Sequence, residues 1–290
     1  MPGDDASNRT DLVAASLAGT RFRQVRWVAE TGSTNTDAMG LARDGAAEGH
    51  VVVADHQQAG RGRLGRAWQA PPGASLLVSV LLRPPSAVVG AVGMAVGLAM
   101  AEAIEERTGV LARLKWPNDL VVADPAGEGD GRGIDRKLAG ILAEADWPAG
   151  STASGGWRAP RPHERVAVVV GVGVNVNWPD ALPDELADTA TALNHLTGAP
   201  VDRADLLVAF LRRLDGHYGS LVAAGAPSAL LPAWKARSAT LGRRVRVDLG
   251  ADDVEGVAVD VTGDGHLVVE TLEGDRRTFA VGDVVHLRPS

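Results

Sequence analysis

The sequence predicts an α+β protein in which a mixed β-sheet with flanking helices is followed by a small C-terminal β-barrel. Apolar runs of strand length and helical segments follow one another in a mixed order, unlike a regular βαβ alternation. From residue 243 the pattern changes to short alternating strands, and Gly-Asp-Gly at 263–265 is typical of a hairpin turn. With 290 residues, of which 45% are hydrophobic, the chain can form one large core and a small appended domain.

The pattern divides the chain into three parts. Residues 1–24 are polar and lack clear periodicity, so we expect a flexible N-terminal arm with at most a short helix around 12–17. The large domain should span 25–238 and the barrel 239–290. Two stretches rich in Gly, Pro and Ser, at 124–135 and 147–163, are expected to be surface loops.

Each element has its own local signal. Short apolar runs predict strands in the large domain at 25–28, 51–54, 75–82, 113–116, 120–123, 137–144 and 165–176. A first helix should begin at Ser33 or Thr34, either of which can cap it, and end near Gly45. Length and apolar periodicity predict further helices at 88–107 and 202–223. The barrel strands are expected at 244–249, 254–261, 266–271, 277–280 and 284–287.

Composition excludes several classes of protein. The absence of cysteine excludes a disulfide framework, a thiolate zinc site and a cysteine nucleophile. The longest apolar run, 87–101, is shorter than the roughly 20 residues of a membrane span, so it predicts a buried helix. The first residues lack a basic segment followed by an apolar run, so a cytoplasmic location is expected. A net charge of −7 argues against a general field for DNA.

Residues 57–68 carry the most informative pattern, Gln-Gln-Ala-Gly-Arg-Gly-Arg-Leu-Gly-Arg-Ala-Trp. Arginine forks on a glycine-rich backbone can approach an anion closely, which favours a mobile loop that binds phosphate or carboxylate. The segment fits neither a Walker A loop nor a GxGxxG motif. Its composition alone also fits a flexible, basic surface loop without a ligand.

Three further segments could contribute to such a site. Lys115-Trp116-Pro117-Asn118-Asp119 places an ammonium, an amide and a carboxylate on a tight turn, which could hold phosphates and a divalent cation. The sequence at 137–142 starts a buried strand with a lysine, and 171–176 places glycines inside a strand, where a ligand could come close. Ordinary alternatives are a surface turn, a solvated strand end and a tightly packed core strand.

Together with Ser-Thr-Asn at 33–35, these four segments resemble the biotin protein ligases in content and in order, and the likeness continues through the C-terminal barrel. The resemblance implies a class II synthetase-like catalytic domain and an SH3-like barrel. It implies that biotin and ATP form biotinyl-5′-adenylate and pyrophosphate, and that a carrier-domain lysine then attacks the adenylate. The carrier would be the biotin carboxyl carrier domain of a biotin-dependent carboxylase.

The resemblance also implies roles for individual residues. Lys137, Arg63 and Asp119 would be catalytic, because cations must offset the repulsion between a carboxylate and an α-phosphate. Magnesium would bind through the phosphates of ATP, and we assign no protein residue as its ligand. Biotin would be bound by Ser33, Thr34, Asn35, Gln57, Arg61, Gly62, Arg63, Lys137, Gly140 and Gly173. ATP would be bound by Arg63, Arg66, Trp68, Lys115, Asn118, Lys137 and Asn175.

Other functions stay open at this point. A lipoate ligase would use similar chemistry, although polar Ser33, Thr34 and Gln57 suit a ureido ring better than a dithiolane. A protein that binds biotin without activating it would not need Lys137. A biotin-responsive repressor is disfavoured by the net charge and because the 24 residues before the domain cannot hold a helix-turn-helix module. We expect a monomer or weak homodimer that binds neither DNA nor membrane.

Overall fold

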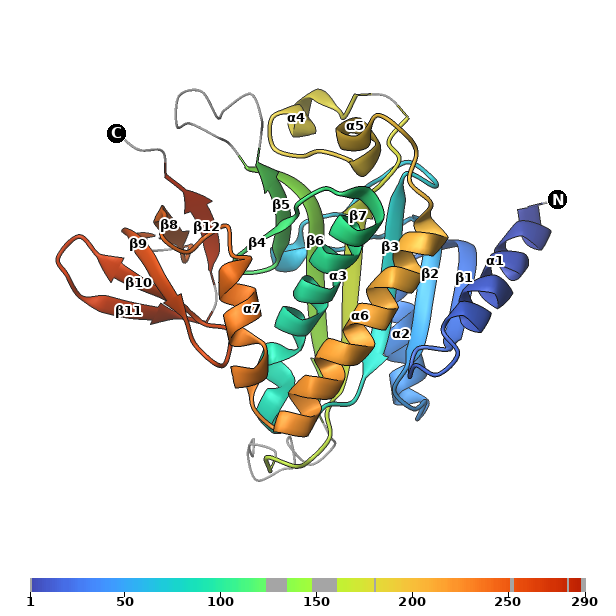
Figure 1. Ribbon diagram of the computed structural model, residues 1–290, viewed down its shortest axis with the longest axis horizontal. Helices are drawn as coiled ribbons and strands as arrows, with labels where there is room; N and C mark the ends of the chain where they lie inside the picture. The colour runs from blue at the N-terminus through green and yellow to red at the C-terminus, as the bar shows by residue number, and fades with distance from the viewer. Residues whose placement is uncertain are drawn as a thin grey trace.

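The computed structural model describes residues 2–123, 135–147, 161–179, 181–250, 253–280 and 282–287. Two β-sheets organise it, a seven-stranded mixed sheet and a five-stranded antiparallel sheet near the C-terminus (Figure 1). This arrangement confirms the predicted α+β class. The two loops expected at 124–135 and 147–163 lie almost wholly outside the described residues.

The large sheet has the strand order β1-β2-β3-β7-β6-β5-β4. Only β1 and β2 run parallel, and every other neighbouring pair is antiparallel. Each strand that the sequence predicts is present, with ends displaced by up to three residues. The strands are β1 (Gln24–Thr31), β2 (His50–Gln57), β3 (Ser75–Leu82), β4 (Arg113–Lys115), β5 (Asp119–Ala123), β6 (Asp135–Asp146) and β7 (Ala167–Asn175).

Helices cover the two faces of this sheet unequally. The long helices α3 (Val92–Thr108) and α6 (Arg203–Ala224) pack on one face, and the shorter α2 (Thr34–Arg43) packs on the other over β2, β3 and β7 (Figure 1). Together with the preceding turn, α3 is long and apolar enough to cross a membrane, but most of it is buried inside the protein. It is therefore a core helix, as its apolar sequence predicts.

Strand β7 shows how the sequence separates these two faces. Side chains alternate along a strand, so Val168, Val170 and their even-numbered neighbours join the core under α3 and α6. The odd-numbered positions face α2, where Ala167 and Val169 pack against the helix. Farther along the same face stand Gly171 and Gly173, which have no side chains to fill the space. The sheet therefore leaves a trough beyond the first turn of α2.

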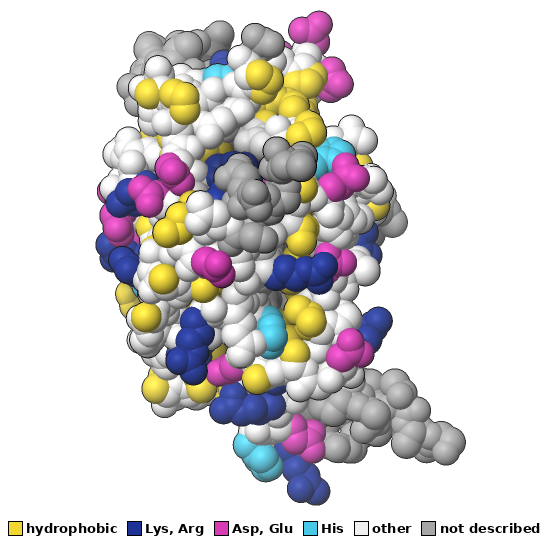
Figure 2. All heavy atoms as spheres, turned by 90° about the vertical axis from the view of Figure 1, so that its right-hand side faces the viewer, with side chains coloured by type: hydrophobic (Ala, Val, Ile, Leu, Met, Phe, Trp, Pro, Cys, Tyr) yellow, Lys and Arg dark blue, Asp and Glu magenta, His cyan; other side chains and the backbone are white. Residues whose placement is uncertain are grey.

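The N-terminal segment corrects the expectation of a flexible arm over 1–24. Helix α1 (Pro2–Ser16) packs beside β1, and the side chains of Val13, Leu17 and Phe22 are buried in the main core. Arg9 also pairs with Asp55 of β2, at 3.2 Å between Nη1 and Oδ1. Figure 2 views the molecule from this side, where acidic and basic side chains are interspersed.

The C-terminal sheet has the strand order β11-β10-β9-β8-β12 and matches the predicted small β-domain. Trp116 joins it to the large sheet, because the indole Nε1 donates to Gly265 O at 2.8 Å and the amide donates to Thr240 Oγ1 at 3.0 Å. The domain boundary at 238/239 stays a prediction. The strands of the C-terminal sheet are β8 (Arg244–Asp248), β9 (Asp253–Val261), β10 (Leu267–Thr271), β11 (Arg276–Phe279) and β12 (Asp283–His286).

Three short helices of the large domain were not predicted from the sequence. They are α4 (Asp184–Ala187), α5 (Leu193–Thr197) and α7 (Leu231–Ala236).

Candidate active site

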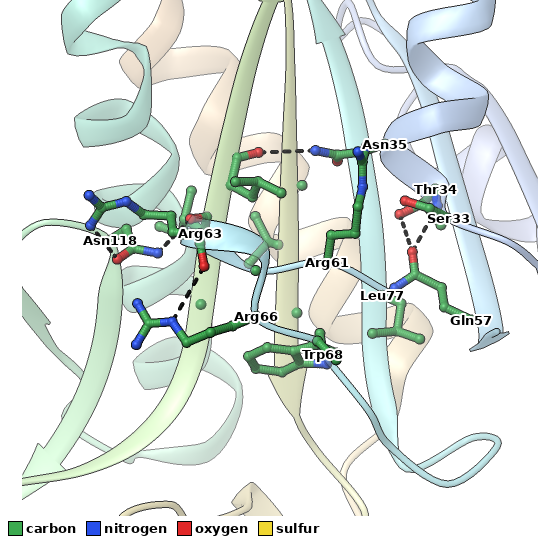
Figure 3. Close-up of a pocket in the computed structure, with 18 of the residues that line it drawn as sticks. Ser33, Thr34, Asn35, Gln57, Arg61, Arg63, Arg66, Trp68, Leu77 and Asn118 are labelled. Carbon is green, nitrogen blue, oxygen red and sulfur yellow. Dashed lines mark hydrogen bonds between the residues drawn. The ribbon is translucent and has the colours of Figure 1, made fainter. Parts of the chain in front are cut away.

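A cavity opens over the trough, between α2, the segment after β2, and strands β3, β6 and β7 (Figure 3). Every residue that the resemblance assigns to biotin lines it, as do three of those assigned to ATP alone. Figure 3 shows Ser33, Thr34 and Gln57 at one end, Arg63, Arg66 and Asn118 at the other, and Trp68 between them. The predicted residues that line the cavity are Ser33, Thr34, Asn35, Gln57, Arg61, Gly62, Arg63, Arg66, Trp68, Asn118, Lys137, Gly140 and Gly173.

The first end of the cavity is polar and largely buried. Gln57 Oε1 accepts hydrogen bonds from the amide of Thr34 at 2.7 Å and from its hydroxyl at 2.9 Å. Ser33 precedes α2 and is only 6% exposed, yet its side chain makes no helix-capping bond, contrary to our expectation for this residue or Thr34. Donors and acceptors therefore face the same small volume, as recognition of a polar ring requires.

The second end gathers three cations and one amide from three separate segments, namely Arg63 and Arg66 of the loop, Lys137 of β6 and Asn118 of the β4–β5 turn. Lys137 Nζ of β6 lies 2.7 Å from Asp119 Oδ1 of β5. Arg63 Nη1 donates to Asn118 Oδ1 at 3.4 Å, so the loop meets the β4–β5 turn. Since three cations and one amide converge here, this end can bind an anionic group.

The C-terminal sheet also reaches the second end, which the sequence analysis did not anticipate. Arg66 Nη2 lies 2.9 Å from Asp283 Oδ2 of β12, and Arg63 donates to Gly282 O at 3.4 Å. Local sequence gives no signal for this contact, because Arg66 and Asp283 are 217 positions apart. The small domain therefore positions the arginines of the larger one.

Trp68 lies directly on the glycines of the trough. A Cβ atom at Gly173 would stand 2.6 Å from Trp68 Cε2, and one at Gly140 would stand 3.1 Å from Trp68 Cζ3. The indole Nε1 is buried and has no hydrogen-bond partner within the described part of the chain. The Lys137 ammonium is 5.7 Å from the centre of the ring. Trp68 thus offers an apolar wall and a free donor to whatever occupies the cavity.

Residues 58–68, here called the arginine–glycine loop, form a compact turn. Gly62 N donates to Arg66 O at 2.6 Å and Trp68 N donates to Gly60 O at 2.9 Å. Leu64 is 78% exposed and has a φ of 55°, which is uncommon for a residue with a side chain. The backbone that holds Arg63 and Arg66 over the cavity therefore includes one strained position.

Three predicted residues do not line the cavity. Asp119 meets it only through its ion pair with Lys137. Asn175 is buried beside it and donates from Nδ2 to Thr191 O at 3.1 Å. Lys115 stands behind the cationic end, where burial lowers the pKa of its ammonium and the carboxylates of Asp119 and Asp135 oppose that shift. Their assignment to catalysis or ATP stays a prediction.

Behind Lys115, a polar cluster joins β6 to the C-terminal sheet. Asp135 Oδ2 lies 2.7 Å from Arg243 Nη1 and 3.2 Å from His286 Nδ1. Burial raises the pKa of Asp135, but the His286 hydrogen bond and the Arg243 charge outweigh it and hold that pKa below its usual value. Burial lowers the pKa of His286, against the effect of its bond to Asp135. The cluster fixes the start of the strand that carries Lys137.

Sequence reasoning also missed Glu144 of β6. Its Oε2 accepts a 2.7 Å hydrogen bond from Asn35 Nδ2, and its carboxylate pairs with Arg61 at 3.3 Å. A single acidic residue near the end of a strand is ordinarily solvated, so nothing local marks it. The usable signal is the alternation of side chains along the strand, which places Glu144 on the same face of β6 as Gly140.

Comparison with known proteins identifies the class of this fold and cavity. Residues 28–153 match the biotin/lipoate A/B protein ligase family, and residues 240–287 match the biotin protein ligase C-terminal domain. The chain is 37% identical to the biotin--[acetyl-CoA-carboxylase] ligase of Mycobacterium tuberculosis, over 99% of this chain and 97% of that protein. It is 31% identical to the bifunctional ligase/repressor BirA of Bacillus subtilis, over 86% of this chain and 70% of that protein.

A solved structure agrees with the sequence comparison. Biotin protein ligase from Aquifex aeolicus, in complex with biotin and ATP, superimposes with a TM-score of 0.70 at 27% identity, covering 92% of this chain and all of that one. The chain belongs to the biotin protein ligase family.

Proposed function

We propose that this protein activates biotin with ATP and transfers it to a lysine of the biotin carboxyl carrier domain of a carboxylase, in the cytoplasm. The observation that carries the proposal is a single cavity with a polar end at Gln57 and a cationic end at Arg63 and Lys137. Membership of the family supports it, as does the likeness to ligases of acetyl-CoA carboxylase. We expect the protein to be a monomer or weak homodimer.

In the first step, a biotin carboxylate oxygen attacks the α-phosphorus of ATP, and the bond to the β-phosphate breaks with release of pyrophosphate. Two anions must approach each other, so fixed cations lower the barrier by stabilising the charge that develops on the phosphoryl oxygens. Lys137, Arg63 and Arg66 supply these cations in the proposed reaction. Ser33, Thr34 and Gln57 would hold the ureido ring at the opposite end.

In the second step, the ε-amine of the carrier lysine attacks the acyl carbon, AMP leaves, and the amine loses a proton. Asp119 is the nearest carboxylate to Lys137, and we assign it to the phosphate side or to the incoming amine. Because the mixed anhydride hydrolyses in water, the arginine–glycine loop and Trp68 must shield it until the carrier arrives.

Magnesium fits this site as a companion of the phosphates. No group of three or more His, Asp or Glu side chains that could hold a metal occurs among the described residues. Mg²⁺ commonly binds through substrate phosphates and one or two carboxylates, and Asp119 is the carboxylate that we assign to that use. When bound, the ion would neutralise charge on the phosphates.

The test is to incubate the purified protein with ATP, Mg²⁺, biotin and a carrier domain, and to weigh the carrier by mass spectrometry. We expect one biotinyl group on one lysine. Isotope exchange between ATP and pyrophosphate, run with biotin or with lipoate, identifies the acid. Exchange that depends on lipoate alone would assign the chain to lipoate, and binding of biotin without exchange would make it a non-catalytic binder.

A further inference from the structure

We propose that Glu144 is a positioning residue that fastens the arginine–glycine loop through Arg61, and that this contact sets how long the acyl-adenylate stays bound. The inference rests on the proposed function, since it concerns the lifetime of the intermediate in the same cavity. Glu144 itself does not line that cavity, so it acts through its neighbours and not on the ligand.

The side chain of Arg61 is turned toward strand β6. Its Nη2 lies 3.3 Å from both carboxylate oxygens of Glu144, and it donates to Thr36 Oγ1 at 3.4 Å. The carboxylate therefore offsets the charge of this guanidinium at the rim. Arg61 is thus poorly placed to bind the phosphates, and its contact ties the loop to the sheet.

Glu144 is in turn held by a buried amide. Asn35 is 5% exposed, and its Nδ2 donates to Glu144 Oε2 at 2.7 Å and to Leu142 O at 3.3 Å. Ser79 Oγ lies 2.6 Å from Asn35 Oδ1. Both hydrogens of the Asn35 amide are therefore used within the protein, so Asn35 orients Glu144 better than it could bind a ligand. The bare Gly171 leaves room for this amide, because a Cβ there would overlap Asn35 Oδ1.

The same polar path anchors the other end of the loop. Ser79 Oγ also lies 2.7 Å from Thr34 Oγ1, which bonds to Gln57 at the end of β2. The loop is thus attached at Gln57, where it begins, and at Arg61, where it passes over the rim. Loss of the attachment at Arg61 leaves the attachment at Gln57 and the contacts of Arg63 and Arg66 with the C-terminal sheet intact. We therefore expect the rim of the loop to open more often while the fold persists.

The experiment measures escape of the intermediate. The enzyme is loaded with radiolabelled biotin, ATP and Mg²⁺ in the presence of pyrophosphatase, freed of unbound label, and the bound label is followed over time after excess unlabelled biotin is added. Glu144→Gln keeps an acceptor for Asn35 but removes the charge that holds Arg61. Arg61→Gln changes the exposed partner alone. The control is Asp146→Asn, which lies on the same strand as Glu144. This substitution breaks the ion pair of Asp146 with Arg43 of α2.

A partly exposed ion pair predicts a dissociation rate raised about twofold to fivefold in Glu144→Gln and in Arg61→Gln. The double variant should dissociate no faster than either single variant, because both remove one contact. Initial rates of pyrophosphate exchange and the thermal midpoint should stay near the parent in Glu144→Gln, which does not line the cavity, and Asp146→Asn should match the parent throughout. An unchanged dissociation rate in Glu144→Gln, or single effects that multiply in the double variant, would overturn the proposal. Failure of the parent protein to form any adenylate would instead refute the proposed function.

Discussion

A single methyl group at Gly173 should weaken ligand binding in the cavity without harming the fold. The Cβ of Gly173→Ala would lie 2.6, 2.8 and 3.0 Å from Cε2, Cζ2 and Nε1 of Trp68. Carbon atoms prefer about 3.5–4 Å, so the indole must retreat by roughly 1 Å. Overpacking of this kind costs about 1–3 kcal/mol, which we expect to appear in ligand binding because Trp68 lies on a loop that can move. The corresponding rise in the apparent KM for biotin is about fivefold to 150-fold.

The assay pairs pyrophosphate exchange kinetics with thermal unfolding. Gly216→Ala is the matched control, since it adds the same methyl group to α6 where the described chain has no atom within 4 Å apart from the adjacent residues and the backbone of the helix itself. Both variants should unfold at or above the parent temperature, because alanine reduces the entropy of the unfolded chain. If Gly173→Ala binds biotin and ATP as the parent does, Trp68 does not rest on the trough when ligands are bound, and the steric reasoning fails.

Three other perturbations test separate parts of the structure. Lys137→Ala should lower the exchange rate about 10²–10³-fold with little change in thermal midpoint, and parent-like exchange would exclude the lysine from catalysis. The folded-state pKa of His286 lies below its ordinary value of 6.5, and that of Asp135 lies below its ordinary value of 3.8, so the unfolded chain takes up protons more readily at both sites. The contribution of each group to the free energy of unfolding is therefore fully present above its ordinary pKa and is lost as the pH falls below that value. Urea unfolding between pH 8 and pH 5 should therefore show falling stability, and His286→Gln should flatten that slope; an equal slope in the variant would place the effect elsewhere. Leu17→Ala, just after α1, should cost about 2–5 kcal/mol of unfolding free energy, whereas Leu12→Ala, at an exposed site within α1, should cost less than about 0.5 kcal/mol. Equal effects would argue against a packed N-terminal segment.

Local pattern predicted the elements well and long-range contacts poorly. The apolar run at 75–82 coincides with β3, and the arginine–glycine loop lines the cavity as its composition indicates. In contrast, the burial of Phe22 depends on packing against residues that lie far from it in the sequence. Asp283 reaches Arg66 only after the small domain has docked, and Glu144 acquires its partner only when α2 places Asn35 beside β6. Such contacts carry no period or motif that a single sequence displays.

The division of β7 into valine and glycine positions explains why one strand can support both a core and a cavity. Even-numbered valines pack under α3 and α6, and the odd-numbered Gly171 and Gly173 open on the opposite face. The register places Gly173 opposite Gly140 of β6, so the trough continues across two strands. A slip of one residue would turn the even-numbered valines toward the face of the cavity, and both glycines toward the core. The packing that stabilises the sheet therefore also fixes the depth of the trough, because the same register satisfies both requirements.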